Sequence, residues 1–334
     1  MTTLLTRCVA IMALIATPAL ADPLTIRVGW STMPGHMIPV LFSHKEVLRH
    51  YGVSYTVEPI AFRGSSPQIT AMAAREVDLV AYSPATLALT VLNAHLDTKI
   101  VADIVQDGVG DFHSETFFVR ADSGITDVAG LRGKRVGSNA VGSASDTAMR
   151  AMLKRSGLSD PRDYTTIEAA FPSLPALLEA KKVDMSVILL PRMLSMAAAG
   201  EVRPLFTAKD AWGPAQLVFL AGRADFLAKN HDAMADFMED YVRAWRWFAD
   251  PANHAEAVAT IARFMKVPET DLAYVFTKDD YYRDPFMRPN PAGVQSAIDV
   301  SKDLGVLPAT IQVAPKYTDL SFVDEAERRI KASP

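Results

Sequence analysis

The sequence contains a single cysteine, Cys8, among 334 residues. Cys8 lies in an N-terminal segment that we expect to be removed, so the mature chain would have no thiol, no disulfide and no cysteine-bound metal. Such a chain depends on its core alone. Its 49% hydrophobic and 22% charged residues are typical of globular proteins of one to three domains.

The chain also lacks an apolar run long enough to span a membrane. Residues 1–21 contain Arg7, a short apolar run and the sequence Ala19-Leu20-Ala21. This pattern predicts a secretory signal peptide that is cleaved after Ala21. Cys8 precedes the cleavage site, which argues against a lipoprotein anchor, so we expect a freely exported protein.

An excess of positive charge is likewise missing. The 34 basic and 38 acidic residues give a net charge of −4, which becomes −5 once Arg7 leaves with the signal. Nucleic-acid-binding proteins usually carry a basic surface. This mild acidity therefore argues against nucleic acid as a partner.

Motifs that carry catalytic or nucleotide chemistry are absent too. There is no His-Glu-x-x-His, no Gly-x-Ser-x-Gly and no Gly-x-Gly-x-x-Gly. Gly137 to Gly142 has P-loop glycine spacing, but Ser143-Ala144 stands where Lys-Ser/Thr is required. His113 lies between acids in "DFHSE", yet strand geometry would turn its neighbours to the opposite face. We therefore expect no catalytic residue, cofactor or metal; a secreted hydrolase with a spatially assembled triad is the enzyme alternative.

What the sequence does contain is an ordered series of matching signals. Arg27 and Arg135, Tyr55 and Tyr164, and Asp78 and Asp184 are separated by 108, 109 and 106 residues. The surrounding patterns predict two copies of a strand–helix–strand–helix–strand unit, each too long for a solenoid repeat. We expect two α/β lobes with mostly parallel sheets covered on both faces. The region after residue 211 is expected to be mainly helical, with its last helix ending near Gly305.

Ligands of such sheets bind beyond the carboxyl ends of the strands. The loops at these ends supply the candidate ligand-binding residues, which are Trp30, Ser31, His36, Arg63, Gly64, Ser65, Ser66, Tyr82, Ser83, Asn139, Gly142, Ser143, Ser145, Phe171 and Pro191. The loops of the two copies match in position, which favours one ligand held between two facing lobes.

Each candidate has a structural alternative. Ser143 and Ser145 lie at a predicted helix start, where they either bind a ligand anion together with free backbone amides or only cap the helix. Arg63 either makes a two-pronged contact with a carboxylate or sulfonate, or is a surface arginine. Trp30 either stacks on a flat ligand or packs, and His36 either donates to an anion or is bonded structurally.

Several segments in fixed order resemble the substrate-binding proteins of ABC transporters. They are "IRVGW", "DSGITDVAGLRGKRVGS", "LLEAKKVDMSV" and "AIDVSKDLGVLP". The branch they resemble serves nitrate, taurine, alkanesulfonates and thiamine-type pyrimidines. The resemblance implies a type 2 periplasmic binding protein fold: two Rossmann-like lobes, a hinge of two crossing strands near Glu115–Arg120 and Gln216–Gly222, and a helical C-terminal region. The expected boundaries are 1–21 for the signal, 22–114 and 216–334 for lobe 1, and 115–215 for lobe 2.

The resemblance also implies a function. It predicts a monomeric periplasmic protein that captures a small organic anion, a sulfonate or an aromatic or alkyl carboxylate, and delivers it to an ABC permease with a cytoplasmic ATPase. Many relatives have a Trp-acidic-Pro segment where this chain has Leu189-Leu190-Pro191. We therefore expect an apolar wall and no zwitterionic ligand. A thiamine-type pyrimidine, an enzyme on the same fold and a detached sensing domain are the alternatives.

Overall fold

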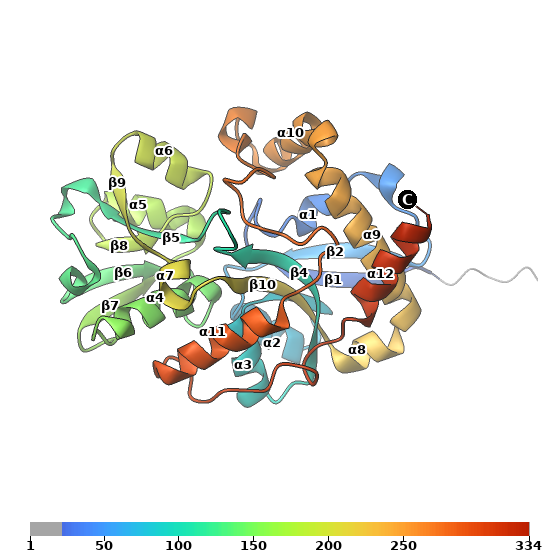
Figure 1. Ribbon diagram of the computed structural model, residues 1–334, viewed down its shortest axis with the longest axis horizontal. Helices are drawn as coiled ribbons and strands as arrows, with labels where there is room; N and C mark the ends of the chain where they lie inside the picture. The colour runs from blue at the N-terminus through green and yellow to red at the C-terminus, as the bar shows by residue number, and fades with distance from the viewer. Residues whose placement is uncertain (1–21, 334) are drawn as a thin grey trace, which may run out of the picture.

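Two five-stranded sheets organise the chain, of which the computed structural model describes residues 22–333 (Figure 1). The predicted signal peptide, residues 1–21, lies outside the described residues. The first sheet has the strand order β2-β1-β3-β10-β4, and the second has the order β7-β6-β8-β5-β9. The strands are β1 Leu24–Trp30, β2 Tyr55–Ala61, β3 Leu79–Tyr82, β4 Thr98–Asp107, β5 Thr116–Arg120, β6 Lys134–Ser138, β7 Tyr164–Glu168, β8 Met185–Val187, β9 Val202–Thr207 and β10 Ala215–Arg223.

Each sheet contains one strand that runs against its neighbours. β10 is antiparallel to β3 and β4 in the first sheet, and β5 is antiparallel to β8 and β9 in the second. β5 follows β4 in the chain and β10 follows β9, so each sheet receives its antiparallel strand directly after the chain leaves the other sheet. The predicted α/β fold is confirmed, with mixed sheets as the consequence of this exchange. We call the parts that carry the first and second sheets lobe 1 and lobe 2.

The repeated sequence signals produce the same backbone contact in both lobes. In lobe 1 the Arg27 N–H donates to the Asp78 carboxylate at 3.0 Å, and the Asp78 N–H donates back to the Arg27 carbonyl at 2.9 Å. In lobe 2, Arg135 and Asp184 exchange the same two bonds, at 2.9 Å and 2.7 Å. The aspartate thus fixes the first strand of each lobe beside the start of the third.

Helices cover the sheets and connect their strands. Those of lobe 1 are α1 Ile38–Leu41, α2 Pro67–Ala73, α3 Pro84–Leu92, α8 Ala224–Lys229, α9 His231–Ala249, α10 His254–Met265, α11 Pro291–Asp303 and α12 Ser321–Ala332. Those of lobe 2 are α4 Ala144–Arg155, α5 Leu174–Glu179, α6 Arg192–Ala198 and α7 Ala208–Trp212. Short 3-10 helices lie at Lys45–Val47, Ala121–Ser123, Val128–Leu131, Phe171–Ser173, Pro251–Asn253 and Glu269–Leu272.

The C-terminal helices return to lobe 1, as predicted. α9 buries an apolar face at helical spacing, and its Phe237 ring stacks on Phe42 with ring centroids 5.4 Å apart. The expectation that the last helix ends near Gly305 is wrong, because α12 follows and packs along α9 (Figure 1). α12 buries Phe322 and Ile330, and its remaining surface is charged, so its apolar stripe is narrow.

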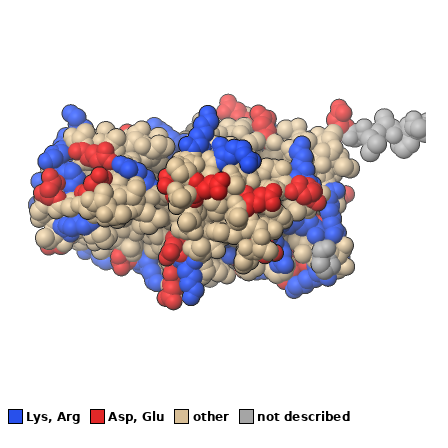
Figure 2. All heavy atoms as spheres, turned by 90° about the horizontal axis from the view of Figure 1, so that it is seen from above, with Lys and Arg blue, Asp and Glu red and all other residues tan. Residues whose placement is uncertain are grey.

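The surface carries charges of both signs. Figure 2 shows basic and acidic side chains interspersed along the face seen from above. No helix among residues 22–333 is both long and apolar enough to cross a membrane.

Candidate functional site

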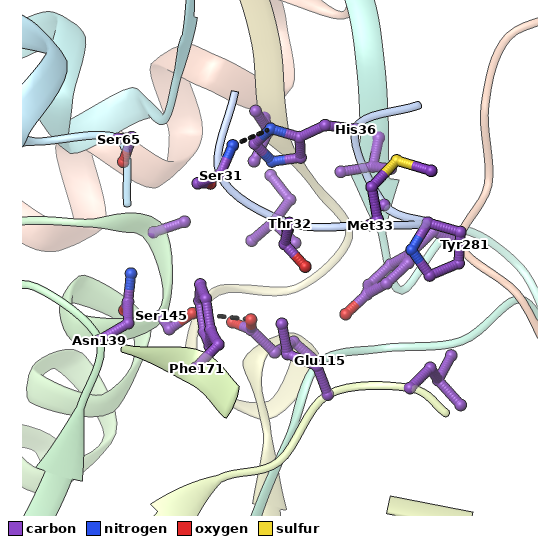
Figure 3. A pocket seen from close by; sticks show the side chains of 18 of the residues that line it. Ser31, Thr32, Met33, His36, Ser65, Glu115, Asn139, Ser145, Phe171 and Tyr281 are labelled. Carbon is purple, nitrogen blue, oxygen red and sulfur yellow. Dashed lines mark hydrogen bonds between the residues drawn. The ribbon is translucent and has the colours of Figure 1, made fainter. Parts of the chain in front are cut away.

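A small cavity lies between the two lobes, at the carboxyl ends of the parallel strands. Its volume is about 50 Å³, and a single water needs about 10–15 Å³ on this measure, so it holds only a compact group. Lobe 1 contributes the loop after β1, lobe 2 contributes the start of α4 and the loops after β7 and β8, and β4 and β10 form the floor. The lining also includes a C-terminal segment with Tyr274, Asp280 and Tyr281 (Figure 3).

Seven of the fifteen candidate residues line this cavity. They are Ser31, His36, Ser65, Asn139, Ser143, Ser145 and Phe171. They come from both lobes, which agrees with the expected arrangement of one site between two facing sets of loops.

His36 is held in a defined protonation state. The Ser31 N–H donates to His36 Nδ1 at 3.1 Å, so the ring proton must be on Nε2 (Figure 3). Burial, together with the nearby positive charge of Arg283, lowers the pKa of His36 to about 3. His36 is therefore a neutral imidazole with one N–H donor.

Glu115 is the buried acid of the cavity, although the sequence analysis did not select it as a binding residue. Its Oε1 accepts a hydrogen bond from Ser145 Oγ at 2.7 Å, and no described residue donates to Oε2. Glu115 is only 4% exposed. Burial raises its pKa to about 8, and the negative charge of Asp107 also raises it, whereas the bond from Ser145 acts in the opposite direction.

The C-terminal segment adds a second acid whose charge is already balanced. Asp280 accepts from Arg283 Nη1 at 3.0 Å and from the Tyr281 N–H at 2.7 Å. Arg283 in turn donates to the Gly35 carbonyl at 3.1 Å, which ties this segment to the loop after β1. Burial raises the pKa values of Tyr274 and Tyr281, so both keep their O–H protons, and no described residue partners the Tyr274 hydroxyl.

The start of α4 divides its two serines between different roles. Ser143 is the N-cap: it accepts from the Asp146 N–H at 3.4 Å and donates to Asn139 Oδ1 at 2.7 Å. Asp146 accepts from the Gly142 N–H at 2.8 Å, one residue earlier than in a capping box. Ser145 instead donates to Glu115. A carboxyl of the chain itself therefore already lies at this helix end.

The candidates outside the cavity fall into two groups, and the first joins the lobes directly. Arg63 forms an ion pair with Glu168 at 3.3 Å, and Ser66 Oγ donates to the Val141 carbonyl at 2.8 Å. A Cβ on Gly64 would lie 2.5 Å from Asn139 Nδ2. We call these contacts the lobe-to-lobe cluster. In this arrangement Gly64 permits close approach to the other lobe, and the expectation that Arg63 neutralises a ligand is not supported by its position.

The Gly142 carbonyl belongs with this group, since it accepts from Thr86 Oγ1 at 3.3 Å across the lobes. The second group serves the interior or the surface of one lobe. Trp30 packs edge-on against Phe264, Tyr82 bonds to the sulfur of Met72, and Ser83 caps α3. Pro191 lies in a neighbouring groove.

That groove continues from the cavity between the lobes. It has a volume of about 680 Å³ and a mainly apolar wall from α5, α6 and the end of α10. The cavity and the groove share five lining residues, which are Thr32, Met33, Phe171, Leu189 and Leu190. The apolar wall expected at Leu189-Leu190-Pro191 is thus divided between the two spaces.

Sequence analysis missed the polar residues that come from outside the repeated loops. Glu115 precedes the crossing strand β5, and sequence analysis considered it only as the start of the hinge and as a neighbour of His113 in a metal motif. No group of three or more metal-ligating side chains occurs within residues 22–333. Tyr274 and Tyr281 lie in the region after residue 211, which sequence analysis described only as mainly helical. Its density of acids and aromatics, in "AYVFTKDDYYRD", is the one signal that pointed there.

Comparisons with known proteins agree with this architecture. A family model described as NMT1/THI5 like matches residues 52–254. The alkanesulfonate-binding protein SsuA from Xanthomonas axonopodis pv. citri, bound to MOPS, has a TM-score of 0.68 at 19% identity, over 89% of this chain and 98% of that chain. The periplasmic nitrate-binding protein NrtA from Synechocystis PCC 6803 has a TM-score of 0.72 at 16% identity, over 93% of this chain and 90% of that chain.

An enzyme has the same fold. The desulfurization enzyme DSZB matches with a TM-score of 0.64 at 15% identity, over 92% of this chain and 99% of that chain. No curated protein matches the sequence. The likenesses show the periplasmic binding protein fold, and the fold alone does not distinguish transport from catalysis.

Proposed function

This chain belongs to the NMT1/THI5-like family, and from that premise we propose that it is a periplasmic solute-binding protein of an ABC transporter. In this role it would capture a small solute between its lobes as a monomer. It would then deliver the solute to a membrane permease that a cytoplasmic ATPase drives.

The observation that carries this proposal is the origin of the cavity wall. Ser31 and His36 come from lobe 1, Asn139 and Phe171 come from lobe 2, and the strands between the lobes form the floor. A ligand in this space touches both lobes only when they are together. Its binding energy therefore favours the closed arrangement, which is the coupling that a capture protein needs.

Of the ligand classes left open by the sequence, the cavity supports a nitrogen-bearing heterocycle such as a thiamine-type pyrimidine better than an organic anion. The anion hypothesis depended on Arg63 and on the start of α4. Arg63 is paired with Glu168, and Ser145 is bonded to Glu115. No lysine or arginine is among the described residues that line the cavity, so a buried anion would lack a counter-charge.

The groove suits the rest of such a solute. A polar head would occupy the cavity, and an apolar body would extend past Met33, Phe171 and Leu190 into the groove. The same opening would serve as the route of entry when the lobes separate.

A thermal-shift screen of the exported protein, refolded to remove bound solute, tests this function. The panel contains compact aromatic and alkyl amines, their matched carboxylates and sulfonates, taurine, nitrate and a hydroxymethylpyrimidine. A true ligand at a hundred times its dissociation constant stabilises the native state by about 2.7 kcal/mol and is recovered unchanged by mass spectrometry. Chemical conversion of a stabilising compound would identify an enzyme instead.

A further inference from the structure

We propose that the solute carries a protonatable nitrogen, an amine or an amidine-type ring base, and that Glu115 is the residue that binds it. This inference rests on the function proposed above and specifies the chemistry of its ligand. It assigns to Glu115 a role in choosing between cations and anions.

The first argument is the unused oxygen of Glu115. Oε1 has a donor in Ser145, while Oε2 has none among the described residues. Figure 3 shows the carboxyl directed toward Ser145, with the hydroxyls of Thr32 and Tyr281 on the other side of Glu115 in the same view. A buried carboxyl oxygen without a partner is costly in either protonation state. When Glu115 is ionised, a ligand N–H is the partner that this oxygen lacks.

The second argument is the charge balance around Glu115. Asp280 is neutralised by Arg283 at 3.0 Å. Asp107, on β4, accepts from the Ser114 hydroxyl and from the Glu115 N–H. Burial lowers the pKa of His113 to about 4, so this nearby imidazole is neutral.

Of the two acids that line the cavity, Asp280 is paired with Arg283, and Glu115 has no cationic partner among the described residues. The cavity wall offers this carboxyl no lysine or arginine among its described residues. The rest of the wall is compatible with a cation: the Tyr281 and Thr32 hydroxyls accept from an N–H, and aromatic faces such as Phe171 favour positive charge. A sulfonate or carboxylate would instead place its charge beside an acid.

The two ligand classes predict opposite responses to pH. The Glu115 side chain keeps its proton to about pH 8 in the empty cavity, because burial and the charge of Asp107 raise its pKa. A cation binds the ionised form and expels this proton, so its affinity increases about tenfold per pH unit up to about pH 8. An anion requires the protonated form, so its affinity decreases above that pH.

The test compares matched probes on three proteins. Benzylamine, benzoate, benzenesulfonate and a 4-amino-5-hydroxymethylpyrimidine are titrated by calorimetry into the refolded exported protein, Glu115→Gln and Glu201→Gln. Glu201 is exposed and lies away from the cavity, so its variant controls for the loss of one negative charge. Glutamine at 115 has the shape of the protonated acid, and a cooperative thermal transition verifies that this variant is folded.

We expect the nitrogen bases to bind more tightly than the matched anions and to lose about 100-fold or more in affinity in Glu115→Gln, with no change in Glu201→Gln. Titration in two buffers of different ionisation enthalpy should show net release of protons, up to one per site, when benzylamine binds at pH 7. Tighter binding of the anions, or base binding that Glu115→Gln retains, would overturn the inference while leaving a solute-binding function intact. A folded protein that binds no member of either series would contradict the proposed function as well.

Discussion

The two strands that cross between the lobes begin with chemically related residues in very different states. Gln216, at the start of β10, has every hydrogen-bonding need met: its Nε2 donates to Asp103 at 2.6 Å and to two backbone carbonyls, and its Oε1 accepts from the Asn290 N–H at 2.8 Å. Glu115, directly before β5, is equally buried but uses only one oxygen. Gln216 therefore stabilises the fold. Glu115 leaves one oxygen free for a ligand, and its incomplete hydrogen bonding lowers the stability of the protein.

The largest expected effect comes from replacing Gln216, whose hydrogen-bonding groups all have partners, with an acid. In Gln216→Glu, a carboxylate replaces the donor that faces Asp103 and the Val105 and Val218 carbonyls. We expect the free energy of unfolding at pH 8 to decrease by about 4 kcal/mol. Burial raises the pKa of Asp103 to about 6, so the loss should be smaller at pH 5, where Asp103 holds a proton. Urea unfolding at both pH values measures this difference; a loss below about 1 kcal/mol at pH 8 would show that the hydrogen bonds of Gln216 contribute little to stability.

The reverse change at the other crossing strand should stabilise the protein. Folded Glu115 keeps its proton to about pH 8, whereas an unfolded glutamate releases it near 4.5, so the folded chain binds more protons between these values. Stability therefore falls as pH rises through this window. Glu115→Gln removes the effect, and we expect an unfolding free energy roughly 4 kcal/mol higher than that of the wild type at pH 8. Equal thermal midpoints of the two proteins at pH 8 would show that Glu115 is not buried as described. At pH 5, close to the unfolded pKa, the difference in unfolding free energy should shrink to below about 1 kcal/mol.

A smaller effect on stability is expected at the start of α4 in lobe 2 than at the crossing strands, and a still smaller one at the start of α2 in lobe 1. Ser143 caps α4, whereas Ser66 precedes α2 without a side-chain cap and bonds across the lobes instead. Ser143→Ala should lower the unfolding free energy by about 1 kcal/mol, and Ser66→Ala by less than about 0.5 kcal/mol. Denaturant unfolding of each single variant measures both losses. Equal losses of unfolding free energy for Ser143→Ala and Ser66→Ala would show that the Ser143 cap does not stabilise α4 more than Ser66 stabilises α2.

The smallest effect is expected at the rim of the cleft. The Arg63 side chain is 57% exposed and that of Glu168 is 35% exposed, so their ion pair is largely screened by water. A double-mutant cycle with Arg63→Ala and Glu168→Ala should give a coupling free energy below about 1 kcal/mol, which decreases further in high salt. A larger, salt-independent coupling would indicate that the lobe-to-lobe cluster holds the cleft closed without a ligand.

Much of the architecture could be predicted from local signals. The spacing of Arg27 and Asp78, and again of Arg135 and Asp184, marks a contact that forms within one strand–helix–strand unit, where nearby residues decide the outcome. The helix start at Ser143 was predictable for the same reason. Ser31, His36 and Phe171, chosen from these patterns as candidates, line one cavity, because the carboxyl ends of parallel strands share an edge.

The polar residues and charge partners of the cavity could not be predicted from such local signals. Arg63 was interpreted as a ligand group because its loop faces the cleft, yet its charge is balanced by Glu168 of the other lobe. Glu115 and Tyr281 were not selected because each belongs to a connecting segment outside the repeat. Their contribution depends on how three distant parts of the chain meet.

By itself, the sequence determined the two α/β units and their order, since periodicity, caps and turns act over short distances along the chain. Only the tertiary structure decided which charges remain unbalanced in the cavity. That outcome depends on pairs such as Asp280 with Arg283 and Glu115 with Ser145, whose burial and partners are set by the packing of the lobes and the C-terminal segment around them. Electrostatic energies change steeply with burial and distance, so the ligand's charge could be inferred only once those positions were known.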